Sequence, residues 1–149
     1  MSAPAASDAD YARETAFHVP PDRVFDALTT LDGLAGWWTP IVSGNPATGG
    51  EITFGFAGLD EEIVMCVDEA SRPSTVIWRC LTNTGHPEWE GTTVVFELET
   101  DNGSAGLLRF RHAGLIPRLN CYEVCESGWE HFLSSLLDYA EHGEGSPFR

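Results

Sequence analysis

His112 is the side chain of this sequence best suited to chemistry, because residues 108–112 alternate between apolar and charged types before it. Alternation along a strand places His112 on the same face as Leu108 and Phe110. An imidazole at the end of an apolar face can orient a ligand or exchange a proton, since its ordinary pKa is about 6.5. It can also serve the fold by hydrogen bonding to the chain where it turns at Gly114. The pattern favours the structural role and leaves the functional role open.

Four cysteines raise the question of a metal site or a reactive thiol. Cys121, Cys125 and His131 lie close in the chain, but their spacing matches none of the paired Cys and His patterns of zinc sites, so we predict no metal. His86 has no partner at an informative spacing. The cysteines are too few and too scattered for the disulfide framework of a small secreted domain, and we expect them to be reduced. Cys121 falls in the first turn of a predicted helix, which predicts a somewhat acidified thiol.

Other catalytic groups lack the residue types or the neighbours that they need. All 8 basic residues are arginine, which excludes Schiff-base catalysis and a phosphate-binding Walker loop, because both need a lysine ammonium. Neither Gly103-Ser104 nor Glu126-Ser127-Gly128 has the two flanking glycines of a nucleophile elbow. Most carboxylates fall on predicted solvent faces, whereas general acid catalysis needs a desolvated carboxyl group. We therefore predict no catalytic residue and no required cofactor.

Aromatic residues on predicted inward faces are the second candidate site. They can line a pocket for an apolar ligand or simply fill a core, and in an ordinary sandwich the core is the commoner outcome. Gly128 in the last helix slightly favours a cavity, because a missing side chain leaves room. The candidate ligand-binding set, completed by His112 and the helix residue Leu133, is Trp38, Phe54, Phe56, Trp78, Phe96, Phe110 and Trp129.

Strand and helix patterns predict the elements that position these side chains. A strand over 11–19 is followed by the segment 20–22, whose prolines and aspartate stop the strand and open a helix. A second, short helical piece covers 32–38. From Gly50 onward apolar residues recur at every second position, which predicts antiparallel strands joined by short links. These strands cover 50–56, 62–68, 75–82, 91–100 and 105–112.

The longest helical signal covers 120–142, where apolar residues recur three and four positions apart. At 1.5 Å per residue this helix would run roughly 35 Å, enough to cross a whole sheet. Asn120 and Glu123 have the spacing of a capping box at its start. The sequence therefore predicts a long helix lying on a curved antiparallel sheet.

The turn at 101–103 predicts how two strands face each other, because loop length sets the register of a hairpin. A two-residue loop would place Phe96 opposite Arg109. A three-residue loop with Gly103 in the left-handed conformation places Phe96 opposite Leu108, and we predict this loop. It points His112 inward and leaves four charged residues on the solvent face, namely Glu97, Glu99, Arg109 and Arg111.

Composition bounds the class of protein. The chain has 149 residues, 42% of them hydrophobic, which is enough apolar surface for one globular domain. A net charge of −15 leaves no basic surface for phosphates, so nucleic acid and anionic membranes are poor partners. No stretch approaches a membrane span, and 1–12 does not have the pattern of a secretion signal. We predict a cytoplasmic protein with a disordered tail over 1–10 and a single domain over 11–149.

Five segments carry a family resemblance, which extends over about 11–148. They are Val24-Phe25-Asp26-Ala27-Leu28-Thr29-Thr30, Gly36-Trp37-Trp38, Trp89-Glu90-Gly91-Thr92, Phe110-Arg111-His112-Ala113-Gly114-Leu115 and Gly128-Trp129-Glu130-His131-Phe132-Leu133. They resemble the START-like SRPBCC superfamily, in particular its branch similar to the C-terminal domain of the heat-shock-protein-90 ATPase activator (AHSA-type). The resemblance implies an α+β helix-grip fold, in which a curved antiparallel sheet wraps around a long C-terminal helix and two short helices follow the first strand.

The same resemblance implies a cavity between that helix and the sheet. In relatives the cavity holds lipids, sterols, polyketides or other hydrophobic molecules, and in a few it performs cyclisation or hydrolysis. Our leading hypothesis is a protein that binds a hydrophobic small molecule there. The alternatives are a cyclase- or hydrolase-like enzyme, with His112 or an inward carboxylate transferring the proton, and an interaction protein that contacts a chaperone through its acidic surface. A homodimer is compatible with each of these hypotheses.

Overall fold

The first strand and the helices that follow it form where the sequence predicts them, in a computed structural model that describes residues 9–100 and 105–148. Strand β1 covers Tyr11–Phe17, helix α1 Pro21–Thr29 and helix α2 Leu31–Trp37. Pro21 at the start of α1 has the fixed φ that suits a first turn. The Thr30 side chain caps α2 by accepting a hydrogen bond from the Gly33 backbone N–H.

Seven antiparallel strands then make one sheet in the order β1-β7-β6-β5-β4-β3-β2. Apolar and polar residues alternate along the strands, and the apolar set is buried on one face. The strands after α2 are β2 (Val42–Gly44), β3 (Glu51–Gly55), β4 (Glu62–Ser71), β5 (Thr75–Asn83), β6 (Thr93–Thr100) and β7 (Gly106–Ala113), with a short 3-10 helix, η2 (Pro87–Trp89), between β5 and β6. Among these strands β2 was not predicted, because three residues are too few to show a period.

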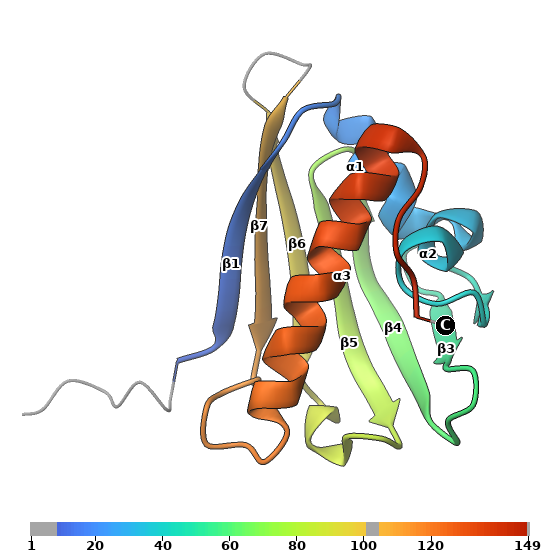
Figure 1. Cartoon of the computed structure of the whole chain (residues 1–149), viewed down its shortest axis with the longest axis vertical. Helices are drawn as coiled ribbons and strands as arrows, with labels where there is room; N and C mark the ends of the chain where they lie inside the picture. The colour runs from blue at the N-terminus through green and yellow to red at the C-terminus, as the bar shows by residue number, and fades with distance from the viewer. Residues whose placement is uncertain (1–8, 101–104, 149) are drawn as a thin grey trace, which may run out of the picture.

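The long helix α3, Tyr122–His142, lies obliquely across the concave face of the sheet (Figure 1). Most of its buried residues recur three or four positions apart, and Trp129 reaches the sheet, with its ring centroid 4.5 Å from that of Phe110. Helices α1 and α2 lie beside the C-terminal half of α3, where Ser135 Oγ donates to the Trp37 carbonyl at 2.8 Å. The α+β helix-grip fold predicted from the sequence is therefore confirmed.

The register of the β6–β7 hairpin corrects the predicted loop. Phe96 lies opposite Phe110, and Thr100 lies opposite Gly106, so the pairing is shifted by two residues from the one that a three-residue loop would give. A shift of two residues keeps every side chain on its face. His112 is accordingly buried and Arg109 exposed, as predicted. The conformation predicted for Gly103 falls outside the described residues.

The start of α3 also differs from the prediction. No side chain of α3 or of the segment just before it caps the helix, and Asn120 and Glu123 form no capping box. The Glu88 carboxylate instead accepts hydrogen bonds from the backbone N–H groups of Asn120 and Cys121, at 3.3 and 3.1 Å. A carboxylate at a helix N-terminus is favoured by the free N–H groups and the helix dipole, whichever segment supplies it. The capping group therefore comes from η2, which no local spacing predicts.

Two predictions concern the chain as a whole. Most of the tail expected over 1–10 lies outside the described residues, which begin at residue 9. Among the described residues, no helix has the combined length and apolar character that crossing a membrane requires.

Candidate ligand-binding site

A cavity of about 250 Å³ opens between the N-terminal half of α3 and the neighbouring end of the sheet. Strand β5, η2 and the C-terminal segment also contribute to its wall. Most of the wall is apolar, and its aromatic part consists of Trp38, Phe56, Trp89, Trp129, Phe132 and Phe148. A concave, mainly apolar surface with a few polar groups is the usual form of a small-molecule site.

Three of the candidate residues from the sequence, Trp38, Phe56 and Trp129, lie in this wall. The other six do not line it. They lie in the buried core beneath and beside it, and they are Phe54, Trp78, Phe96, Phe110, His112 and Leu133. The aromatic set is thus divided between a packed core and a pocket at one end of the helix.

Ring packing explains this division. The Trp38 ring stacks on Trp78 with centroids 6.0 Å apart and lies 4.3 Å from the centroid of Phe54. Phe96 contacts Phe110 edge to face, with centroids 5.2 Å apart. Such contacts are favourable beyond the area that they bury, and they fill the space beneath the middle of α3. The mainly apolar pocket opens where the helix begins.

Asn83, at the end of β5, supplies an unsatisfied polar group in the apolar wall. Its side chain is only 2% exposed. The oxygen Oδ1 accepts a hydrogen bond from the His86 backbone N–H at 2.8 Å, which fixes the orientation of the amide, whereas Nδ2 has no hydrogen-bond partner among the described residues. A buried donor without a partner costs about 1–3 kcal/mol.

His112 lies behind the pocket and connects its wall to the sheet. The Trp129 indole Nε1–H donates to His112 Nδ1 at 3.1 Å. Because an indole can only donate, the neutral imidazole carries its proton on Nε2, which donates to Thr92 Oγ1 at 2.7 Å. Thr92 Oγ1 in turn donates to the Trp89 carbonyl at 2.6 Å. The expected bond from His112 to the turn at Gly114 is therefore replaced by a chain of bonds that orients Trp129.

Burial decides the charge of His112. The side chain is fully buried, and desolvation lowers its pKa to about 3, although the Asp10 carboxylate acts in the opposite direction. The ring is neutral near pH 7 and both of its nitrogens are already hydrogen-bonded. These two facts favour a structural role for His112 and disfavour proton transfer to a ligand.

Comparison with known proteins agrees with the fold and the resemblance. Residues 18–141 match the family described as Activator of Hsp90 ATPase homolog 1-like protein, AHSA1. The chain belongs to this family. A comparison with curated proteins found no match.

Solved structures place this AHSA1-family chain among proteins of the same fold. The Aha1 dimer from Colwellia psychrerythraea is 31% identical, with 92% of this chain and 99% of that chain covered and a TM-score of 0.79. An Hsp90 activator from Plasmodium falciparum is 20% identical over 91% of this chain and 96% of that chain, with a TM-score of 0.72. DynU16, from the dynemicin biosynthetic locus, is 22% identical over 93% of this chain and 49% of that chain, with a TM-score of 0.74.

The cysteines of this AHSA1-family chain behave differently from the prediction in one respect. All four are free, as expected, but burial, followed by the hydrogen bond that the Cys121 thiol donates to Cys125, raises the pKa of Cys121 to about 12. The effect of desolvation on the pKa of Cys121 thus outweighs that of the helix N-terminus, and the thiol is protonated near pH 7. His131, which is close to them in sequence, lies apart and bonds to the Ser146 carbonyl at 2.9 Å. His86 takes its place beside Cys121 and Cys125.

Several residues of the pocket wall were not predicted from the sequence. They include Asn83, His86, Trp89 and Phe148. They come from a strand end, a loop, a 3-10 helix and the last segment of the chain, where apolar periodicity is too short to read. Phe148 reaches the wall because its backbone N–H donates to the Trp38 carbonyl at 2.7 Å. Only Trp89 carried a signal, as part of a segment that resembles the family.

A substitution at Gly128 tests whether the space beside this part of α3 is open. Apart from the neighbouring residues and the backbone of its own helix, no heavy atom lies within 4 Å of the position that a Cβ would take there. Gly128→Ala is therefore expected to raise the free energy of unfolding by about 0.5–1 kcal/mol, because alanine has the higher helix propensity and meets nothing. Urea unfolding followed by circular dichroism measures this change.

The matched control for that substitution is Gly36→Ala in α2. A Cβ at Gly36 would overlap the Tyr139 ring, so this variant should be less stable than the parent protein. Equal destabilisation by the two alanines would show that the space beside Gly128 is not open.

Proposed function

We propose that this protein binds a small, neutral and largely apolar molecule that carries a hydrogen-bond acceptor. The observation that carries the proposal is a mainly apolar pocket whose lining includes Asn83, a buried residue with an unpaired amide donor. An apolar pocket supplies affinity, and one placed polar group supplies orientation. The fold supports ligand binding in general, and DynU16, from a biosynthetic locus, shares it.

The size of the pocket favours a small ligand. Its volume is about 250 Å³, whereas drug-sized ligands occupy pockets of about 300–1,000 Å³. The five tryptophans of the chain are all buried, and they take up interior space that a sterol or a long lipid would need. We therefore favour a molecule of one or a few rings over a lipid.

Charge favours a neutral ligand over an anionic one. Glu61 lies in the wall, and the whole chain has a net charge of −15. A carboxylate beside a pocket of low dielectric repels a second negative charge strongly. The acceptor that pairs with Asn83 is therefore expected to be a carbonyl, an ether or a hydroxyl oxygen.

Filling the pocket at Gly128 tests the proposal. Prodan, a neutral naphthyl ketone whose emission reports the polarity around it, should bind the parent protein with micromolar affinity. Gly128→Leu should weaken this binding at least tenfold, because the added side chain enters the space beside Trp129. Fluorescence titration measures the affinity, and quenching of tryptophan emission is a second readout since Trp38, Trp89 and Trp129 lie in the wall.

The control is Ser127→Leu, which adds the same side chain to an exposed position of the same helix. It should leave prodan affinity unchanged. Both variants are checked for native circular dichroism before titration. Unchanged binding to a folded Gly128→Leu protein would reject the pocket as the binding site.

A contact with an Hsp90 chaperone is a second candidate function. It is favoured by family membership and by the likeness to an Hsp90 activator from Plasmodium falciparum along most of both chains. The Aha1 of Colwellia psychrerythraea is a dimer, which is compatible with a dimer here. An increase in the ATPase rate of a purified Hsp90 on addition of this protein would support the second candidate.

A further inference from the structure

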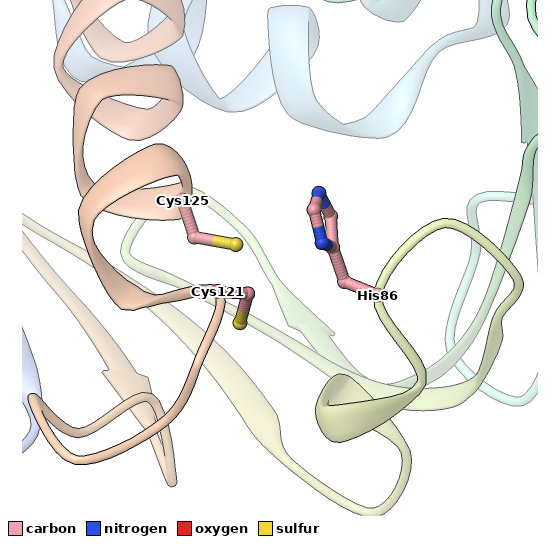
Figure 2. A group of neighbouring side chains, drawn as sticks. All are labelled: His86, Cys121 and Cys125. Carbon is pink, nitrogen blue, oxygen red and sulfur yellow. The ribbon is translucent and has the colours of Figure 1, made fainter.

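One histidine and two cysteines meet at the start of α3. His86 lies in the loop between β5 and η2, Cys121 immediately precedes α3, and Cys125 lies one turn into the helix. One ligand atom from each of the three side chains, a ring nitrogen and two sulfurs, lies within 4.8 Å of both others. Figure 2 shows the Cys125 thiol and the His86 ring facing each other across the gap between helix and loop.

Hydrogen bonds that involve no metal hold the two segments together. The Glu88 carboxylate accepts from the backbone N–H groups of Asn120 and Cys121, and the Trp89 Nε1–H donates to Cys125 Sγ at 3.2 Å. On the loop side, the His86 backbone N–H donates to Asn83. The backbone of the cluster is thus positioned in advance, and only side-chain rotation is left to complete it.

We propose that His86, Cys121 and Cys125 form a binding site for Zn²⁺. Two thiolates and one imidazole match the ligand preferences of this ion. Zn–S and Zn–N bonds of about 2.3 and 2.0–2.1 Å place tetrahedral ligands about 3.5–3.8 Å apart, so separations within 4.8 Å need to close by about 1 Å. The hydrogen bond from Trp89 to the Cys125 sulfur is the kind of outer contact that supports a ligating thiolate.

The surroundings suit a cation. The Glu88 carboxylate lies beside Cys121 and accepts a hydrogen bond from its backbone N–H at 3.1 Å. The net charge of −15 attracts divalent cations to the protein as a whole. Two thiolates neutralise the charge of the ion.

Three protein ligands leave one tetrahedral position for water or for a donor atom of a ligand. His86 and Cys125 both line the pocket described above, so the site lies beside it. The metal site itself does not depend on the proposed function, because none of its three ligands comes from a bound molecule.

Titration of the reduced full-length protein with Co²⁺ tests the site. Co²⁺ replaces Zn²⁺ in such sites and shows a thiolate charge-transfer band in the near ultraviolet. We expect one equivalent to bind with this band, and Zn²⁺ to displace it. His86→Gln, Cys121→Ser and Cys125→Ser should each lower Zn²⁺ affinity at least tenfold. No prodan is present, so failure here is distinguishable from failure of the pocket proposal.

The matched control is Cys66→Ser. Cys66 is half-buried on β4 and its thiol donates to Asp68. It lies between the buried Met65 and Val67, so its side chain points to the face of the sheet opposite α3. This variant should bind Co²⁺ as the parent protein does. His86 is half-buried in a loop, so His86→Gln keeps the test valid if a cysteine variant fails to fold. Absence of the charge-transfer band, loss of the band in Cys66→Ser, or unchanged Zn²⁺ affinity in a folded His86→Gln protein would each overturn the site.

Discussion

His112→Ala is expected to lower the free energy of unfolding by about 3–5 kcal/mol, because it removes a fully buried ring and two hydrogen bonds at once. The Trp129 indole N–H would be left buried without an acceptor, and Thr92 Oγ1 would lose a donor. Each group left unsatisfied in this way costs about 1–3 kcal/mol, and the space left by the imidazole adds to the loss. Urea unfolding at pH 7 measures the change.

Two further variants separate these contributions. His112→Phe leaves no cavity, because the phenyl ring is somewhat larger than the imidazole ring, but it removes both hydrogen bonds, so it should cost about 1–3 kcal/mol. His142→Ala removes an exposed histidine and should change stability by less than about 0.5 kcal/mol. A loss below about 1 kcal/mol for His112→Ala would contradict the hydrogen-bonded network.

Ligand affinity gives an independent measure of the role of His112. The residue does not line the pocket, so prodan affinity of folded His112→Phe should stay close to that of the parent protein. A tenfold loss of affinity in a stable variant would instead place His112 among the binding residues.

The second large effect is a loss of stability in acid. Burial lowers the folded-state pKa of His112 to about 3 from the ordinary 6.5, so between these values the unfolded chain binds a proton that the folded protein does not. Stability from this group is therefore complete above pH 6.5 and is lost as pH falls to about 3. At 1.36 kcal/mol per pKa unit, the total loss is about 3–5 kcal/mol.

Comparing the parent protein with His112→Phe isolates the contribution of His112 to the pH dependence of the free energy of unfolding, because the carboxylates common to both proteins titrate alike. The parent protein should be the more stable one at pH 7 by about 1–3 kcal/mol. The difference should shrink by about 1.4 kcal/mol per pH unit below the ordinary histidine pKa, so the two stability curves should cross near pH 5. Parallel curves between pH 7 and pH 4 would show that His112 does not titrate in this way.

The faces of strands and helices were predictable from the sequence because each is set by a local period. Phe110 and His112 point inward and Arg109 points outward, whatever the length of the preceding loop. Loop length itself was predicted wrongly. A shift of two residues preserves the hydrophobic pattern, so the pattern contains no information that distinguishes Leu108 from Phe110 as the partner of Phe96.

The candidate site could be predicted only in part for a related reason. Alternation identifies an inward aromatic residue but does not show whether other rings fill the space in front of it. Trp38 and Trp129 line the pocket, whereas Phe96 and Trp78 lie inside the cluster of packed rings. Which rings stay uncovered depends on how helix and sheet cross.

Residue types and local periods were enough to predict the family, the order of the elements and the inward position of His112. The contacts that these residues make depend on the tertiary structure. The capping of α3 by Glu88, the unpaired donor of Asn83 in the pocket and the meeting of His86 with Cys121 and Cys125 join segments distant in the chain. Contacts of this kind depend on how the layers pack, and no local pattern encodes them.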